Sequence, residues 1–359
     1  MRKPLLFLPG PMQVPDEIRA AGDRPMFNHR SAQMEQLLAK LQADCRPLFG
    51  TAGDVIFLAA SGTGAMESAI VNMTSPGDEV IVMAGGTFAE RWTEIAASYG
   101  LHVHNVDADW QYGATLDEVA RAMSNHPNAQ VVFLTWSESS TGVLIELDEI
   151  GKLVRSQNKF LVVDAVSGLA VSPLEMERWE IDVVISGSQK GLMIPAGLGL
   201  VAIGTRAWER TRDARSARYY WDWKKYQGPL PFTPALTLLF QLEAALEYVK
   251  TQGLPDFFRR KADVAGSIRD LVKQSRFEIY ARRPGNGITA VVPNPGFDIA
   301  AFIGRLERDF SIQIAGGLGR LKDSTFRIGH VGFVGDEELD YFIQSFSAAL
   351  GNSKKINNA

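Results

Sequence analysis

Short apolar segments alternate with amphipathic segments through the first half of the chain. Seven of them read as strands that are apolar over most of their length, and they cover residues 55–59, 79–83, 102–106, 131–136, 160–164, 183–186 and 198–203. Apolar strands separated by amphipathic helices are typical of a mostly parallel sheet with helices on both faces. We therefore expect an α/β fold whose functional groups gather at the carboxyl ends of the strands.

The pattern changes after this repeat. Residues 218–234 are rich in aromatic residues and proline, which indicates a connector or an interface. A long helix is expected at 235–251, followed by a smaller α/β region with strands near residues 277–280, 289–292, 311–314 and 325–328. The expected organisation is an N-terminal segment (1–17), a large domain (18–252) and a small C-terminal domain (253–359).

Composition narrows the function classes. The chain has 359 residues, 46% of them hydrophobic and 22% charged, and a formal net charge of -4. This balance predicts a globular protein without a general attraction for nucleic acid or an anionic membrane. No apolar run approaches the roughly 18 residues of a membrane span. We expect neither nucleic acid nor membrane as a partner.

Cysteine usage favours the cytoplasm. Cys45 is the only cysteine, so no intrachain disulfide can form, and no clustered Cys/His spacing suggests a metal site. The apolar stretch between Pro4 and Pro9 is too short for a signal peptide.

Two strand ends carry candidate chemistry. Lys190 closes the string Ser-Gly-Ser-Gln-Lys just after a largely apolar run at 181–185, and Asp164 ends the preceding apolar run. A pyridoxal phosphate (PLP) enzyme needs a lysine amine that forms an imine with the cofactor aldehyde, and a carboxylate that keeps the pyridine nitrogen protonated. Taken alone, Lys190 could be a solvated surface charge and Asp164 a turn residue.

An ordered set of motifs resembles the class V aminotransferases, specifically the alanine-glyoxylate (serine-pyruvate) aminotransferase family. Besides the Lys190 string, these motifs are Pro9-Gly10-Pro11, Ser61-Gly62-Thr63-Gly64, Glu138-Ser139-Ser140-Thr141-Gly142, Val163-Asp164, Gly316-Gly317-Leu318-Gly319 and Arg327-Ile328-Gly329. The resemblance implies PLP fold type I, with a mostly parallel seven-stranded sheet in the large domain. It also implies a homodimer with active sites at the subunit interface.

The resemblance also implies roles for single residues around the cofactor. Lys190 would bind the cofactor and act as its proton carrier, and Asp164 would contact the pyridinium nitrogen. Phe88 would stack on the ring, and Ser139 and Gln189 would be polar contacts. The expected phosphate-binding turn joins a strand to a helix and consists of Ser61, Gly62, Thr63, Gly64 and Ala65.

The resemblance and the sequence also indicate roles for residues outside this set. Arg327 would clamp the substrate carboxylate, with Gly10 beside the substrate. Thr233 would reach the cofactor phosphate of the neighbouring subunit, although by itself it reads as a helix N-cap. Thr87 and Glu90 read as a capping box that places Phe88 in the first helical turn. Where Trp136 stands, family members commonly have histidine.

We therefore expect an aminotransferase that moves an amino group from a small L-amino acid, such as alanine or serine, to a keto acid such as glyoxylate or pyruvate. A class V lyase, or a transaminase with a phosphonate, ureido or pyridoxamine donor, is the alternative. A cysteine desulfurase would need a cysteine in the C-terminal half, where this chain has none. A non-catalytic nucleotide-binding protein is a more distant alternative and would leave Lys190 and Arg327 unexplained.

Overall fold

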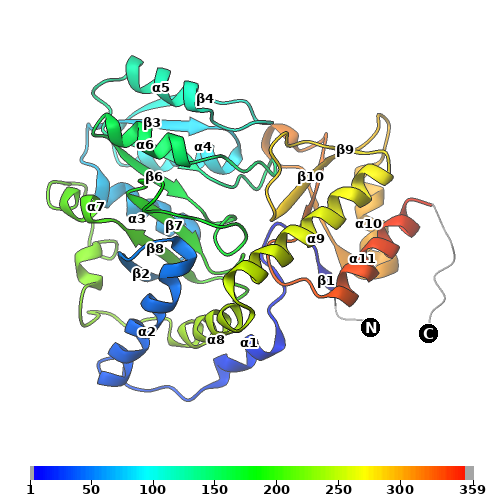
Figure 1. Ribbon diagram of the computed structural model, residues 1–359, viewed down its shortest axis with the longest axis horizontal. Helices are drawn as coiled ribbons and strands as arrows, with labels where there is room; N and C mark the ends of the chain where they lie inside the picture. Colours follow the sequence, from blue (N-terminus) through cyan, green and yellow to red (C-terminus); the bar gives the residue numbers. More distant parts are fainter. Residues whose placement is uncertain (1–3, 352–359) are drawn as a thin grey trace.

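The computed structural model describes residues 4–351. Its largest sheet has seven strands in the order β2-β8-β7-β6-β5-β3-β4 (Figure 1). Strand β8 runs antiparallel to both of its neighbours, and the other pairs are parallel. The predicted seven-stranded, mostly parallel sheet is confirmed. The strands are β2 (Asp54–Ala59), β3 (Glu79–Ala84), β4 (His102–Asp107), β5 (Val131–Thr135), β6 (Phe160–Asp164), β7 (Val183–Gly187) and β8 (Leu198–Ile203).

Alternate residues of the strands enter two cores, one on each face of the sheet. Val55 and Phe57 of β2 belong to one core, whereas Ile56 and Leu58 belong to the other. Strand β4 is less buried than the apolar pattern predicted, because it lies at the edge of the sheet. The helices around the sheet are α2 (Ala32–Phe49), α3 (Gly62–Met73), α4 (Thr87–Ser98), α5 (Leu116–Asn125), α6 (Asp148–Ser156), α7 (Thr205–Arg210) and α8 (Leu236–Gln252).

A smaller C-terminal region follows the long helix α9 (Leu254–Gln274), which crosses between the two parts of the molecule in Figure 1. Its sheet is antiparallel, in the order β12-β13-β10-β9. The elements of this region are β9 (Glu278–Ile279), β10 (Ile288–Val292), α10 (Ile299–Phe310), β11 (Ile312–Gln313), β12 (Ala315–Gly316), β13 (Phe326–Gly329) and α11 (Asp336–Ala349). Short helical segments are α1 (Asp16–Ala20), η1 (Ala21–Asp23), η2 (Trp223–Tyr226) and η3 (Gly319–Leu321).

The single strand predicted at 311–314 is wrong in one respect. The chain forms two short strands here, because β11 pairs in parallel with the N-terminal strand β1 (Leu5–Leu6) while β12 pairs with β13. Phe7 continues from β1 and stacks on Phe342, with 3.9 Å between ring centroids. Residues 5–7 are thus packed into the C-terminal region.

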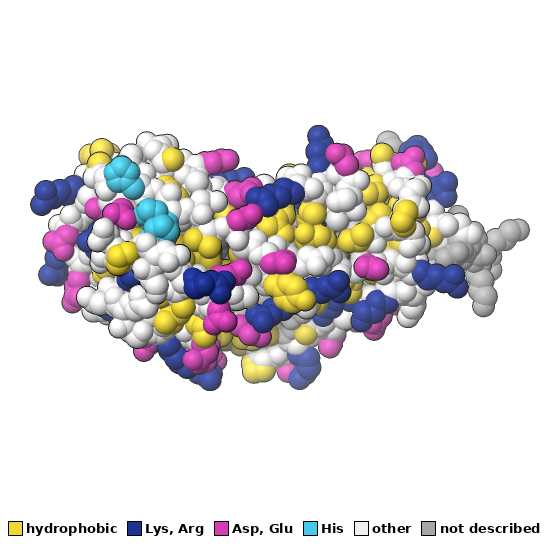
Figure 2. All heavy atoms as spheres, turned by 90° about the horizontal axis from the view of Figure 1, so that it is seen from above, with side chains coloured by type: hydrophobic (Ala, Val, Ile, Leu, Met, Phe, Trp, Pro, Cys, Tyr) yellow, Lys and Arg dark blue, Asp and Glu magenta, His cyan; other side chains and the backbone are white. Residues whose placement is uncertain are grey.

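The surface carries charges of both signs. Figure 2 shows basic and acidic side chains interspersed over the face seen from above, without a single basic patch on that face. No helix within residues 4–351 is both long and apolar enough to cross a membrane.

Candidate active site

A cavity of about 240 Å³ opens at the carboxyl edge of the large sheet. Nine of the residues predicted to bind cofactor or substrate line it, and these are Gly10, Ser61, Gly62, Thr63, Phe88, Ser139, Asp164, Gln189 and Lys190. Residues that the sequence interpretation did not single out also line it, and these are Met66, Arg91, Ser137, Val166 and Ser167. Segments that lie far apart in the sequence thus line a single cavity.

Lys190 lies in the turn that follows β7. Ser188 fixes this turn, because its hydroxyl donates to the Pro195 carbonyl at 2.7 Å and accepts from the Leu198 amide at 3.1 Å. The Lys190 amine donates a hydrogen bond to the Pro9 carbonyl. Burial lowers the pKa of Lys190 to about 8, although the carboxylate of Asp164 acts in the opposite direction. A substantial fraction of this amine is therefore neutral, and nucleophilic, near physiological pH.

Asp164 is the last residue of β6, the strand next to β7. Its Oδ1 atom accepts a hydrogen bond from the Val166 amide at 2.8 Å, and the side chain is buried at the cavity wall. Burial raises the pKa of Asp164 to about 7. A cationic N–H group placed in the cavity would favour the ionised carboxylate, so the position fits a pyridinium nitrogen.

The first turn of α3 provides free backbone amides at the wall of the cavity. Ser61 is the N-cap residue, and its hydroxyl accepts from the Gly64 amide at 3.4 Å. Within residues 4–351, the amides of Gly62 and Thr63 make no hydrogen bond to the chain. Unpaired amides at a helix N-terminus bind anions well, so this turn fits a phosphate group.

Gln189 provides a second test of whether a cofactor fits. Its Oε1 atom is buried and has no hydrogen-bond partner among the described residues, although the side chain lines the cavity. A buried acceptor without a partner costs free energy. A bound donor group in the cavity would satisfy it.

Helix α4 presents Phe88 to the cavity, as predicted, but the predicted capping box is wrong. Gly86 is the N-cap residue, and Thr87 makes no side-chain cap. The amides of Phe88 and Ala89 instead donate to Oε2 of Glu138, at 3.1 Å and 3.0 Å. A carboxylate from the neighbouring loop therefore replaces the local cap that the sequence suggested.

Glu138 organises both sides of this wall, and the sequence interpretation had treated it only as part of a motif. Its Oε1 atom accepts from the amide and the hydroxyl of Ser140, at 2.9 Å and 2.7 Å. The side chain is 3% exposed, and burial raises its pKa while these four donors oppose the change. It thus connects the start of α4 to the loop that carries Ser139.

Arg91 is a second residue that the sequence interpretation missed. Its guanidinium carbon lies 4.9 Å from the centroid of the Phe88 ring, and Nη1 donates to the Thr63 hydroxyl at 3.1 Å. It stands one helical turn after Phe88, and this spacing was the available signal. Arg91 places a positive charge beside the α3 turn.

Arg327 lies behind the cavity wall on β13. Its Nε atom donates to the Gly316 carbonyl at 2.9 Å and Nη1 donates to the Ser139 carbonyl at 3.1 Å. The neighbouring side chains of Phe326 and Ile328 enter the C-terminal core. The guanidinium is thus oriented by backbone carbonyls next to a residue of the cavity wall.

Several predicted site residues lie elsewhere. Gly64 and Ala65 do not line the cavity, and a methyl group added at Gly199 of β8 would lie 3.1 Å from the Ala65 Cβ atom. Thr233 is exposed and does not cap α8, whose N-cap residue is Ala235. Trp136 packs in the core, 6.0 Å from Trp179 between ring centroids.

A dicarboxylate substrate would need a second cation, and Arg320 and Arg30 lie outside the cavity wall. Arg320 pairs with Glu90 and Asp107, at 3.1 Å and 3.2 Å, and Arg30 is exposed.

Known proteins share this fold and much of this sequence. The chain is 36% identical over 358 residues to a protein of Synechococcus named soluble hydrogenase, small subunit, covering 97% of this chain and 93% of the relative. It is 33% identical over 353 residues to the serine–glyoxylate aminotransferase of Methylorubrum extorquens, covering 93% and 88%. The crystal structure of an alanine–glyoxylate aminotransferase from Nostoc superposes with a TM-score of 0.93 at 27% identity, covering 98% of this chain and 96% of that one.

A family match covers most of the chain, since residues 15–314 match the description Aminotransferase class-V. The amine, the carboxylate and the free amides of the cavity agree with the cofactor that this family uses. The protein belongs to the class V aminotransferases and is a PLP-dependent enzyme.

Proposed function

We propose that this enzyme transfers the α-amino group of a small L-amino acid, serine or alanine, to a keto acid, with glyoxylate as the preferred acceptor. The two aminotransferases compared above carry serine or alanine, and glyoxylate, in their names. The observation that carries the proposal is the position of Lys190 and Asp164 in one cavity at the carboxyl edge of the large sheet, with Arg327 hydrogen-bonded to the Ser139 carbonyl of the cavity wall. These groups provide a nucleophilic amine, a partner for a cationic ring and a carboxylate anchor.

PLP supplies an electron sink at the substrate α-carbon when it is bound. Asp164 would hold the ring nitrogen in its protonated form, because a buried carboxylate beside an N–H cation forms a strong charge-assisted hydrogen bond. The amides of Gly62 and Thr63 would bind the phosphate. The side chain of Gln189 would donate or accept at the cofactor edge.

Lys190 has two tasks in this proposal. Its Nζ atom would hold the cofactor in the resting enzyme, and the free amine would carry the proton of the substrate α-carbon. Both tasks require a neutral amine, and burial favours that form. The Pro9 carbonyl accepts from this amine and so restricts its position.

Arg327 would anchor the substrate carboxylate. Its Nη2 atom makes no hydrogen bond among the described residues, while Nε and Nη1 are held by the carbonyls of Gly316 and Ser139. A fixed guanidinium provides a planar pair of donors for a carboxylate.

The donor is proposed to be small because Ser137, Ser139 and Ser167 line the cavity. These short polar side chains suit a methyl or hydroxymethyl substituent. Arg91 is the feature that would favour a dicarboxylate instead, since it adds a cation to the lining. Its hydrogen bond to Thr63 in the α3 turn favours a role beside the phosphate.

A homodimer in the cytoplasm completes the proposal. Thr233 is exposed and lies outside the cavity of its own chain, which suits a contact to a second subunit's cofactor. Lone Cys45 is buried and no disulfide is present in the described chain, which suits a reducing compartment. Sedimentation of the purified enzyme tests the dimer, and Thr233→Ala should weaken cofactor binding in it.

Two other activities have a counterpart among related proteins or chemistry. A class V lyase would use the same amine, and only its products distinguish it. Hydrogenase chemistry, the activity named for the Synechococcus relative, uses metal centres held largely by cysteine thiolates. This chain has one cysteine, and residues 4–351 contain no group of three His, Cys, Asp or Glu side chains placed to hold a metal.

The deciding experiment is the absorption spectrum of the PLP-loaded enzyme during addition of single L-amino acids without a keto acid. Loss of the lysine-bound cofactor band and growth of the aminated cofactor band with serine or alanine would support the proposal, and glyoxylate should reverse the change. A change in the absorption spectrum with aspartate, and with neither serine nor alanine, would contradict the proposal of a small donor. Release of substrate fragments without cofactor amination would identify a lyase. Lys190→Ala should abolish turnover in either case.

A further inference from the structure

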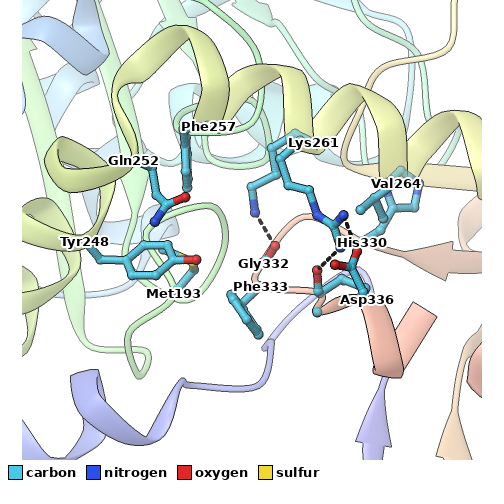
Figure 3. A pocket seen from close by; sticks show the side chains of 13 residues that line it. Met193, Tyr248, Gln252, Phe257, Lys261, Val264, His330, Gly332, Phe333 and Asp336 are labelled. Atoms are coloured by element: carbon cyan, nitrogen blue, oxygen red, sulfur yellow. Dashed lines mark hydrogen bonds and ion pairs between the residues drawn. The ribbon is translucent and has the colours of Figure 1, made fainter. Parts of the chain in front are cut away.

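A second cavity, of about 280 Å³, lies where α8, α9 and the segment before α11 meet (Figure 3). Tyr248 and Phe333 lie edge to face, with 6.1 Å between ring centroids, and Phe257 also lines the cavity. None of its lining residues lines the cofactor cavity. It is therefore a separate site, at the junction between the large sheet and the C-terminal region.

Lys261 of α9 places its amine inside this cavity. The side chain is 6% exposed, and Nζ donates to the Val331 carbonyl at 3.2 Å and to the Gly332 carbonyl. Figure 3 shows the amine between Gly332 and the side chain of Gln252. Within residues 4–351, no carboxylate pairs with Lys261. Burying a cation without a counter-ion is costly, and burial lowers the pKa of Lys261 to about 7.

The other ionisable groups around the cavity do not supply the missing negative charge. Asp336 pairs with Arg260 at 2.5 Å, and both side chains are substantially exposed. His330 is held neutral by burial, with Nδ1 donating to the Asn286 carbonyl. Burial raises the pKa of Tyr248, so its phenol is neutral as well. The interior of the cavity therefore has an unbalanced positive charge when Lys261 is protonated.

We propose that this cavity binds a small monocarboxylate that carries an aryl or branched alkyl group. The carboxylate would accept hydrogen bonds from Nζ of Lys261 and from the side-chain amide of Gln252. The apolar group would lie against Tyr248, Phe257 and Met193. A carboxylate that pairs with a buried ammonium and satisfies its remaining N–H gains a charge-assisted hydrogen bond.

An occupant would contact segments that lead to the active site from two sides. The Met193 amide donates to the Lys190 carbonyl at 3.0 Å, so the cavity wall includes the turn of the cofactor lysine. A methyl group added at Gly332 would lie 2.7 Å from Cβ of Met12, which stands two residues after Gly10. The ligand would thus be a regulator that fixes this junction, and its binding does not depend on which donor the enzyme uses.

Benzoate is a suitable probe, with benzyl alcohol as the uncharged counterpart of similar shape. Isothermal titration of the PLP-loaded enzyme should show benzoate binding that is about tenfold tighter at pH 6 than at pH 8, because the carboxylate requires the protonated form of an amine that titrates near pH 7. Benzyl alcohol should bind much more weakly at both pH values. Equal binding of the two probes, or no binding of benzoate, would overturn the proposal.

Variants assign the binding to this cavity. Lys261→Met should remove benzoate binding, since it keeps the stem and removes the amine. Lys273→Met on the same helix is the matched control, because its side chain is 66% exposed, and it should bind as the unaltered protein does. Arg327→Lys should also keep benzoate binding. If Arg327→Lys loses benzoate binding while Lys261→Met retains it, benzoate binds in the active site and the proposal is wrong.

A second measurement does not depend on the folding of a variant. Reductive methylation of the unaltered enzyme labels accessible neutral amines, and mass spectrometry of its peptides quantifies each lysine. Benzoate should slow the labelling of Lys261 at least several-fold and leave the labelling of Lys273 unchanged. Equal labelling of Lys261 with and without saturating benzoate would contradict the proposed site.

Discussion

The amine of Lys190 donates a hydrogen bond to the carbonyl of Pro9, across 181 positions of the chain. The N-terminal segment, anchored to the C-terminal region through β1, thereby forms one wall of the cofactor cavity. Cofactor lysine, large sheet and C-terminal region meet at this contact. The N-terminal segment is therefore part of the catalytic architecture.

Gly10 should be the most sensitive position of this wall. A Cβ atom there would lie 2.5 Å from Lys190 Nζ and 2.7 Å from its Cε and Cδ atoms, and φ is +133°. Gly10→Ala should displace the lysine and lower turnover at least about tenfold, since misplacement of a catalytic group by an ångström is costly. Steady-state kinetics and PLP titration measure this.

The matched control for Gly10 is Gly296→Ala. Gly296 also has a positive φ, +81°, but no heavy atom lies within 4 Å of the added Cβ. The Gly296→Ala variant has the backbone strain of a positive φ but no steric clash with a neighbouring atom. Its turnover should therefore stay near that of the unaltered enzyme. Similar losses in both variants would show that strain, and not contact with Lys190, causes the effect.

The capture of PLP by the apoenzyme should depend on pH through Lys190. Burial lowers its pKa to about 8, and the neutral amine is the reactive form. The rate of cofactor-band formation should therefore rise about tenfold from pH 6 to pH 7 and level off above about pH 8. Stopped-flow absorbance measures the profile. A rate that keeps rising above pH 9 would contradict the lowered pKa.

Asp164 offers an internal check on that profile. Its negative charge raises the pKa of Lys190, in opposition to burial. Asp164→Asn removes the charge and keeps the shape, so the midpoint of the profile should move to lower pH. An unmoved midpoint would mean that the two groups are not electrostatically coupled in the apoenzyme.

Glu138 should act as a positioning residue through α4. In Glu138→Gln, one of the two acceptor oxygens becomes an NH₂ group that faces backbone N–H donors. Leaving buried donors unsatisfied should lower the free energy of unfolding by about 2–4 kcal/mol, and the loosened Phe88 should weaken PLP binding. Denaturant unfolding and PLP titration measure the two effects.

The matched control for this variant is Glu94→Gln, an exposed carboxylate on the same helix. It should leave both quantities nearly unchanged. If Glu138→Gln lowers stability without altering PLP affinity or the cofactor absorption band, its role is structural only.

The sequence predicted the parts of this site that local pattern determines. Asp164 ends an apolar run and Lys190 follows the next one, so parallel pairing of β6 and β7 brings their ends to the same edge of the sheet. The seven strands were predictable for the same reason. Except in β4, their apolar character reflects burial on two faces, which depends little on distant contacts.

The parts that long-range contacts determine were not predictable from local pattern. The Thr87 capping box had a good local signal, but Glu138, about 50 positions away, takes the amides that the box would have used. The split of the strand at 311–314 depends on β1, which lies some 300 residues earlier. The roles of Arg91 and Glu138 depend on contacts with distant segments, so local pattern does not predict them.

His330 should make the folded protein sensitive to acid. It is 1% exposed, and burial lowers its pKa to about 3, whereas an unfolded histidine titrates near pH 6.5. Because the folded-state pKa is the lower one, the stabilisation is complete above pH 6.5 and is lost as the pH falls. From pH 7 to pH 5 this single group should lower the free energy of unfolding by about 2 kcal/mol.

Urea unfolding of His330→Gln should lack that part of the decline, since glutamine keeps a donor and an acceptor for Asn286 and Thr289 but does not titrate. His102→Gln, at an exposed position, should follow the unaltered protein. An identical decline in all three proteins would show that carboxylates alone set the acid stability.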